Sequence, residues 1–215
     1  MGLLESMHGS SHRDATARLL ADGWSACGIG DWATVWRSPD GERVARISPF
    51  EPAYEVFVRL CRRLAGHPLL PRVHFDAPLA GGGRVTVLEF LLPTEPPEAA
   101  AVWQRWDAAA PHDPVTEVRR EAELLHAEAA EAIPFWGGID HNPSNVMKSA
   151  ADDVTFVDLF YVEGRELYRA LREDPERIAR DFPPHQREYI CDIAAIARMT
   201  TPRELAELRK SAGLA

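Results

Sequence analysis

The feature that most constrains the fold of this chain of 215 residues is a short stretch with two carboxylates and one side-chain amide. Residues 138–147 carry Asp140 and, five positions later, Asn145. An apolar run of β type over residues 154–157 then leads to Asp158. The order Asp-x-x-x-x-Asn followed by Asp is typical of a phosphoryl-transfer site, where one carboxylate lies near an acceptor hydroxyl and an amide and a second carboxylate bind Mg²⁺.

This stretch resembles the catalytic loop of the protein-kinase-like superfamily, which reads H-R-D-x-x-x-x-N in protein kinases and H-G-D-x-x-x-x-N in aminoglycoside phosphotransferases. Residues 157–160, Val-Asp-Leu-Phe, resemble the metal-binding D-F-G turn. The resemblance implies an α+β fold of two lobes, with a small β-rich N-terminal lobe and a reduced, mostly helical C-terminal lobe. It also implies that Asp140 orients the acceptor hydroxyl, and that Asn145 and Asp158 bind Mg²⁺.

Upstream of this loop lies a match to the kinase glycine-rich loop, G-x-G-x-x-G-x-V. The matching residues are Gly28, Gly30, Ala33 and Val35, with alanine in place of the third glycine. They lie in a segment that the turn signal at residues 39–41 marks as a β-hairpin. By the resemblance, this loop covers the phosphates of ATP.

Arg46 takes the place of the strand lysine that holds the nucleotide phosphates in kinases. An arginine can grip phosphate oxygens in a fork, although the two residue types are not interchangeable at a site of fixed geometry. Glu55, on a helix expected over residues 52–64, is the candidate partner of Arg46, and Glu51 is a second candidate. The alternatives are a solvent-facing Arg46 and a surface pair between Glu55 and Arg59.

The strand expected over residues 83–92 resembles the strand that runs into the kinase hinge. The resemblance implies that the backbone at Glu89 and Leu91 hydrogen-bonds the adenine edge of ATP. A plain sheet strand would show the same periodicity. Prolines within residues 93–97 break the strand and mark the expected lobe boundary.

We therefore expect one kinase-like domain over residues 1–215, with a loose leader over 1–13, an N-terminal lobe over 14–93 and a C-terminal lobe over 94–215. Periodicity and capping signals predict further helices over 14–20, 116–131, 164–172 and 184–199, and two that begin after the caps Asp174 and Thr201. The helix over 184–199 is expected to bury Tyr189, Ile193, Ile196 and Ala197.

Three departures from the family pattern bear on activity. Gly138 stands where kinases usually have histidine before the catalytic aspartate, Phe160 replaces the glycine of D-F-G, and Arg46 replaces lysine. These departures leave open the alternative that the chain is a catalytically weak pseudokinase, which acts as a nucleotide-dependent binding module. The metal-binding and acceptor-binding residues are all present, which favours active transfer. Lys148 is a rival phosphate ligand, although its place after the loop favours an outward-facing strand position.

The composition and net charge limit the classes of partner that are expected. A net charge of -9 and a pI near 5.4 argue against a nucleic-acid partner bound through its phosphates. The sequence shows no apolar stretch of membrane-spanning length, so no membrane partner is expected. Three scattered cysteines favour a reducing cytoplasm, and the excess of arginine over lysine favours a bacterial or phage source.

The acceptor is expected to be a hydroxyl. The short segment between hinge and catalytic loop favours a protein Ser/Thr hydroxyl, as in a small atypical protein kinase. The alternative is a small-molecule phosphotransferase of the aminoglycoside type, because an acidic protein suits a cationic antibiotic.

Overall fold

The computed structural model describes residues 2–214, which form two compact units. The first unit contains the chain up to Pro52, His74–Leu88, and the chain from Glu163 onward. The second contains Ala53–Val73 and Glu89–Val162. The chain contains both helices and small sheets, which confirms the expected α+β class.

Neither unit is continuous in sequence, so the units do not coincide with lobes over 14–93 and 94–215. The helix expected over 52–64 is α2 (Tyr54–Arg63), and it belongs to the second unit. The helices after Glu163 belong to the first unit, with the N-terminal sheet. The long-range packing of the C-terminal segment, which a division by sequence position ignores, accounts for the difference.

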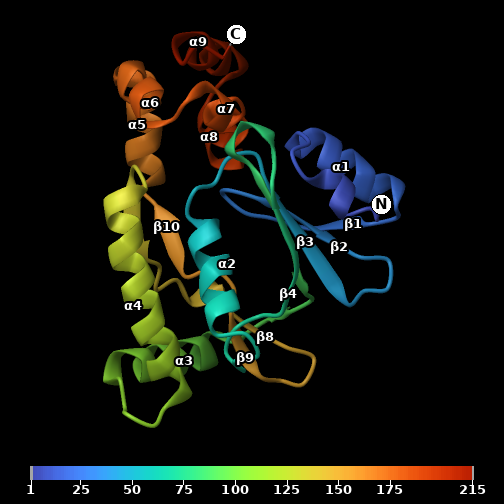
Figure 1. The fold of residues 1–215 in the computed structure, drawn as a ribbon, viewed down its shortest axis with the longest axis vertical. Coiled ribbons are helices and arrows are strands. Elements are labelled where there is room, and N and C mark those ends of the chain that lie inside the picture. The colour runs from blue at the N-terminus through green and yellow to red at the C-terminus, as the bar shows by residue number, and fades with distance from the viewer. Residues whose placement is uncertain (1, 215) are drawn as a thin grey trace. The chain divides into compact units, whose positions relative to one another are not determined.

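A five-stranded sheet of order β1-β2-β3-β5-β4 forms the centre of the first unit (Figure 1). Its strands are Ser25–Ile29 (β1), Thr34–Arg37 (β2), Arg43–Ser48 (β3), Val73–Pro78 (β4) and Arg84–Glu89 (β5). The predicted hairpin joins β2 to β3, which pair antiparallel with Val35 opposite Arg46. The glycine-rich segment joins β1 to β2 in a second hairpin.

Helix α1 (His12–Ala21) covers one face of this sheet, where its Leu19 packs in a core cluster with Ile47 and Val85. Successive residues of a strand point to opposite faces. Arg46, next to Ile47 in β3, therefore points to the face away from α1.

The expectation of a loose leader over residues 1–13 is wrong. Glu5–Met7 forms a 3-10 turn, and Met7 is completely buried in the same core cluster as Leu19. The backbone N–H of Gly9 also donates to the carbonyl of Pro78 in β4. The burial of Met7 and this hydrogen bond both help to attach the segment to the sheet.

The C-terminal part of the first unit is helical, with α5 (Gly164–Glu173), α6 (Pro175–Asp181), α7 (Pro184–Arg187), α8 (Ala194–Met199) and α9 (Pro202–Ser211). Both predicted caps are confirmed. The side chain of Asp174 accepts from the N–H of Arg177, and Thr201 forms a complete capping box with Glu204.

The prediction of a single helix over 184–199 is wrong. The chain breaks into α7, a 3-10 turn at Ile190–Asp192 and α8, and Ile193 before α8 has a non-helical backbone, with φ -57° and ψ 128°. Ile193 and Ile196 are buried as expected, but Tyr189 is only half-buried and Ala197 is exposed. The 3-10 turn gives the side chain of Asp192 its ion pairs with α1 and α9, which the helical periodicity did not reveal.

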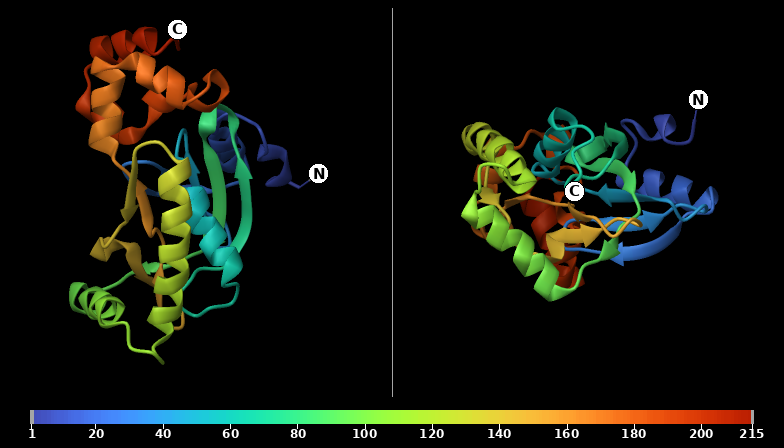
Figure 2. Two further views of the ribbon diagram at one scale, coloured as in Figure 1. Left: turned by 60° about the vertical axis from the view of Figure 1, so that its left-hand side comes forward. Right: turned by 90° about the horizontal axis from the view of Figure 1, so that it is seen from below.

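The second unit contains α2, α3 (Pro96–Ala108) and α4 (Pro114–Ala132) with two small sheets. The sheets have the orders β10-β7 and β6-β8-β9, from the strands Leu92–Pro93 (β6), Trp136–Ile139 (β7), Val146–Lys148 (β8), Val154–Phe156 (β9) and Phe160–Val162 (β10). Helices α2 and α4 lie side by side (Figure 2), joined by an ion pair between Arg63 and Glu121. Within residues 2–214, every helix is too short or too polar to traverse a lipid bilayer.

Candidate functional site

The loop after β7 holds Asp140 and Asn145 in direct contact. The side-chain amide of Asn145 donates through Nδ2 to Oδ2 of Asp140 at 2.9 Å. The other carboxylate oxygen, Oδ1, accepts from the backbone N–H of Asn142 at 3.1 Å. The N–H of Asp140 itself donates to the carbonyl of Leu159 at 2.9 Å. Both oxygens of Asp140 are thus oriented by neighbouring donors.

A 3-10 turn at Pro143–Asn145 makes this contact possible. Asn142 caps the turn, because its side-chain oxygen accepts from the backbone N–H of Ser144 at 3.0 Å and from the Ser144 hydroxyl at 2.8 Å. Proline at the first position suits the start of such a turn, where its missing N–H is not needed. The turn brings Asn145 back over Asp140, five residues earlier.

The orientation of Asn145 follows from charge and hydrogen-bonding capacity. An ionised carboxylate only accepts hydrogen bonds, so the amide must present its nitrogen to Asp140. Its oxygen Oδ1 is then the atom that Asn145 can offer to a cation. Mg²⁺ takes oxygen ligands, so this donor set fits the predicted metal.

Backbone hydrogen bonds join Asp158 to the same loop. The N–H of Val157, the preceding residue, donates to the carbonyl of Asn145 at 2.9 Å. The carbonyl of Val157 accepts from the hydroxyl of Tyr54 at 3.3 Å. Asp158 is half-buried between β9 and β10. The second unit thus brings Asp140, Asn145 and Asp158 into one local network.

Gly138 has a structural explanation in β7. Its φ is +113°, and a Cβ there would lie 3.3 Å from Cε1 of His126 in α4. Nδ1 of His126 accepts from Nε1 of Trp136 at 2.9 Å, which ties α4 to the strand that leads to Asp140. The contact between His126 and Trp136 could not be predicted from the sequence, because an isolated histidine in a helix with many charged residues gives no signal of it.

The ring of His141, next to Asp140, packs against α3. Its centroid lies 4.7 Å from that of Trp103 and 5.9 Å from that of Trp106. Both tryptophans also contact Phe156 at the end of β9. This aromatic group connects the two chain segments that carry the predicted site residues.

Arg46 in the first unit is half-buried and pairs with the buried Glu51. Its Nη2 donates to Oε1 of Glu51 at 2.5 Å and its Nη1 donates to Oε2, with 13% of the arginine side chain and 4% of the glutamate side chain exposed. The alternative of a solvent-facing Arg46 is therefore wrong. Glu51 was the second candidate partner, whereas the pairing with Glu55 stays a prediction. The proposed surface partner of Glu55, Arg59, pairs with Glu128 of α4.

The glycine-rich segment forms a tight reversal between β1 and β2. Gly28 lies opposite Val35, beside a bulge in β1, and the N–H of Gly30 donates to the carbonyl of Ala33 at 2.8 Å. The carbonyl of Asp31 at the tip accepts from the N–H of Ala195 in α8 at 2.9 Å. The side chain of Asp31 also pairs with Arg198 of α8.

The remaining predicted residues lie in the second unit. Glu89 ends β5, and its side chain accepts from the backbone N–H of Arg72 at 2.9 Å. Leu91 is buried just before β6. Lys148 bridges Glu98 and Asp152, each at 2.8 Å, and its hydrogen bonds to Asp152 and then Glu98 raise its pKa. These pairs support the structural interpretation of Lys148 over a phosphate ligand.

No family model and no curated protein matches the sequence. Among solved structures, the aminoglycoside phosphotransferase APH(3'')-Id from Streptomyces rimosus ATCC10970 matches over 95% of this chain and 98% of its own. The sequence identity is 16% and the TM-score is 0.38. A likeness at this level carries no argument about activity, so the functional case stands on the residues themselves.

Proposed function

We propose that this chain is an ATP- and Mg²⁺-dependent phosphotransferase that moves the γ-phosphate of ATP to a hydroxyl. The observation that carries the proposal is the hydrogen bond between Asn145 and Asp140, with Asp158 joined to the same loop through Val157. Asp140 orients the acceptor hydroxyl and takes up its proton. The amide oxygen of Asn145 and the carboxylate of Asp158 hold Mg²⁺, which neutralises charge on the phosphates.

Residues of the first unit are proposed to bind the phosphates. Arg46 supplies a permanent positive charge, and its buried pairing with Glu51 keeps the guanidinium in one orientation. The loop from Gly28 through Gly30 and Ala33 to Val35 covers the phosphates. Glu55 steadies Arg46 as a further partner, and the backbone at Glu89 and Leu91 binds the adenine edge.

Two acceptor classes remain, and each has an observation in its favour. Between β6 and β7 the chain forms only α3 and α4, with no further helix that would build a small-molecule pocket, which favours a protein Ser/Thr hydroxyl. However, α5 begins at Gly164, two residues after β10 ends, which leaves little room for a segment that binds a peptide. A small-molecule acceptor is therefore the second candidate.

The test measures transfer of ³²P from γ-labelled ATP, with a protein lysate and an aminoglycoside panel as acceptors. Asp140→Asn should abolish transfer to every acceptor while Mg·ATP still raises the melting temperature. The matched control is Asp152→Asn, because Asp152 is 82% exposed in a turn with a φ of +69° that asparagine also adopts.

Thermal stabilisation by Mg·ATP without transfer to any acceptor would contradict the enzyme and support a nucleotide-dependent binding module. Equal transfer by Asp140→Asn and the unmodified chain would contradict the role of Asp140.

A further inference from the structure

The tip of the glycine-rich segment is held by α8, which lies far along the chain. The carbonyl of Asp31 accepts from the backbone N–H of Ala195 at 2.9 Å, and the carbonyl of Gly30 accepts from Nη2 of Arg198 at 3.4 Å. Nη2 of Arg198 also donates to the carboxylate of Asp31. Two consecutive carbonyls of the segment therefore point at α8.

The direction of these two carbonyls decides where the next two N–H groups point. In a planar trans peptide the C=O and N–H bonds point in opposite directions, and residues 2–214 contain no cis peptide bond. The N–H groups of Asp31 and Trp32 belong to the same two peptides, so they point away from α8. Neither N–H donates to an acceptor within residues 2–214. Consecutive free N–H groups in a tight reversal can bind an anion such as phosphate.

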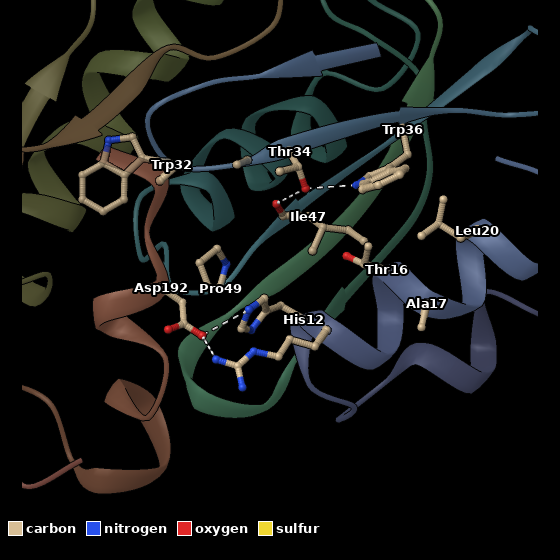
Figure 3. Close-up of a pocket in the computed structure, with 13 residues that line it drawn as sticks. His12, Thr16, Ala17, Leu20, Trp32, Thr34, Trp36, Ile47, Pro49 and Asp192 are labelled. Carbon is tan, nitrogen blue, oxygen red and sulfur yellow. Dashed lines mark hydrogen bonds and ion pairs between the residues drawn. The ribbon is translucent and has the colours of Figure 1, made fainter. Parts of the chain in front are cut away.

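Helix α8 is attached to the rest of the first unit, which allows it to act as a support. Ile193, directly before the helix, and Ile196 within it are 1% and 3% exposed. Asp192 pairs with Arg13 of α1 and with Arg209 of α9, each at 2.5 Å, and Figure 3 shows the contact with α1. Because α1 covers the five-stranded sheet, the helix that holds the tip is joined to the sheet from which the tip extends.

The side chain of Trp32 adds a contact with another part of the C-terminal segment. A Cβ at Gly164, the first residue of α5, would lie 3.4 Å from Cζ2 of the indole, so the ring packs against the start of this helix. Trp32 also lines one pocket together with Asp192 (Figure 3). The backbone and a side chain of the tip are thus both placed by residues after Glu163.

We propose that α8 positions the glycine-rich segment for phosphate binding, through Arg198 and the backbone N–H of Ala195. By holding the carbonyls of Gly30 and Asp31, it keeps the next two N–H groups turned toward the phosphates of ATP. This inference rests on the proposed function, in which the segment covers those phosphates. A segment that is ordered before the ligand arrives loses less conformational entropy on binding, so α8 should raise the affinity for the phosphates. The affinity for the adenosine part should not change, since these N–H groups face the phosphates alone.

The first measurement is amide hydrogen exchange by NMR on the full chain without nucleotide. The probe is the N–H of Gly30, because its bond to the carbonyl of Ala33 closes the reversal at the tip. Arg198→Gln should speed its exchange about two- to fivefold, since ion pairs at this exposure are weak. The matched control is Arg203→Gln, at an arginine of α9 that is 88% exposed, and it should leave the exchange unchanged.

A second pair of variants tests the backbone contact. Ala195→Pro removes the N–H that binds Asp31, and proline is tolerated in the first turn of a helix. Exchange at Gly30 should become about fivefold faster, an ordinary effect of losing one hydrogen bond. Ala194→Pro is the matched control and should leave the exchange unchanged, because the N–H of Ala194 donates to no acceptor in the described part of the chain.

The second measurement is isothermal titration calorimetry with Mg·ATP and with adenosine, which has no phosphates. The double variant Arg198→Gln with Ala195→Pro removes the three hydrogen bonds from these residues to the tip. It should bind Mg·ATP about tenfold more weakly, because only a fraction of the molecules then present the two N–H groups together. It should bind adenosine with unchanged affinity. The double control Arg203→Gln with Ala194→Pro should bind both ligands as the unmodified chain does.

Three results would overturn the proposal: unchanged exchange at Gly30 in both Arg198→Gln and Ala195→Pro, undiminished binding of Mg·ATP by the folded double variant, or an equal loss of affinity for Mg·ATP and adenosine. If the unmodified chain bound no Mg·ATP, the proposed function would fail, and the exchange at Gly30 would still show whether α8 holds the tip.

Discussion

The ion pair between Arg46 and Glu51 offers a quantitative test of the proposed phosphate-binding role of Arg46. Glu51→Leu leaves the guanidinium of Arg46 buried without this carboxylate. Removing one partner of a buried pair costs about 3–5 kcal/mol, because the remaining charge loses the compensation that this partner supplied. Only 13% of the Arg46 side chain and 4% of the Glu51 side chain are exposed, so this pair belongs with buried ion pairs and not with surface pairs.

The magnitude can be converted into a melting temperature. For a chain of 150–250 residues, 1 kcal/mol corresponds to a shift of roughly 2–4 °C. Glu51→Leu should therefore lower the melting temperature by about 6–12 °C if the loss is near 3 kcal/mol. The double variant Arg46→Met with Glu51→Leu removes both charges of this pair, and should recover most of that loss.

The assay is a double-mutant cycle by urea denaturation of the unmodified chain, Arg46→Met, Glu51→Leu and the double variant. A coupling free energy of about 2–3 kcal/mol is expected. In addition, Mg·ATP should stabilise the unmodified chain but not the folded double variant, since the latter lacks the phosphate ligand. Additive single effects would refute the buried pair, and full Mg·ATP stabilisation of the double variant would refute the role of Arg46.

Three further perturbations have defined outcomes. Gly138→Ala should lower the free energy of unfolding by about 1–3 kcal/mol and reduce phosphate transfer, because alanine at φ +113° is strained and its Cβ presses on an imidazole. The control is Gly66→Ala, since Gly66 has a φ of +85° but no neighbouring atom within 4 Å of an added Cβ, so this variant measures the cost of backbone strain alone. Both free energies of unfolding are measured by urea denaturation, and an equal loss in the two variants would contradict the contact with the imidazole as a cause. The hydroxyl of Ser38, with further donors in the turn, lowers the pKa of Asp40 to about 2, so its contribution to stability is complete above pH 4 and declines as the pH falls toward 2. An NMR titration of Asp40 checks this, and an ordinary pKa near 4 would exclude it. Thr201→Ala should cost about 1 kcal/mol by removing the capping box, with faster amide hydrogen exchange confined to α9, and unchanged exchange would refute the cap.

Local patterns in the sequence determined the elements and part of the site. Periodicity over residues 116–131 predicted α4, because a helix repeats its buried face every three or four residues. The caps at Asp174 and Thr201 predicted the starts of α6 and α9, since a cap needs only the next three residues. The contact of Asp140 with Asn145 was predictable for the same reason, as one turn of chain connects them.

Only the tertiary structure decided which distant surfaces meet. The pairing of Asp31 with Arg198 spans 167 residues, and no short-range pattern encodes it. Met7 is buried because its segment packs against α1 and the sheet, in one cluster with Leu19 and Ile47. The helix expected over 184–199 is broken where Asp192 pairs with arginines from two other helices. Hydrogen bonds within a few residues follow from the local sequence, whereas burial and ion pairing depend on elements that come together only when the chain folds.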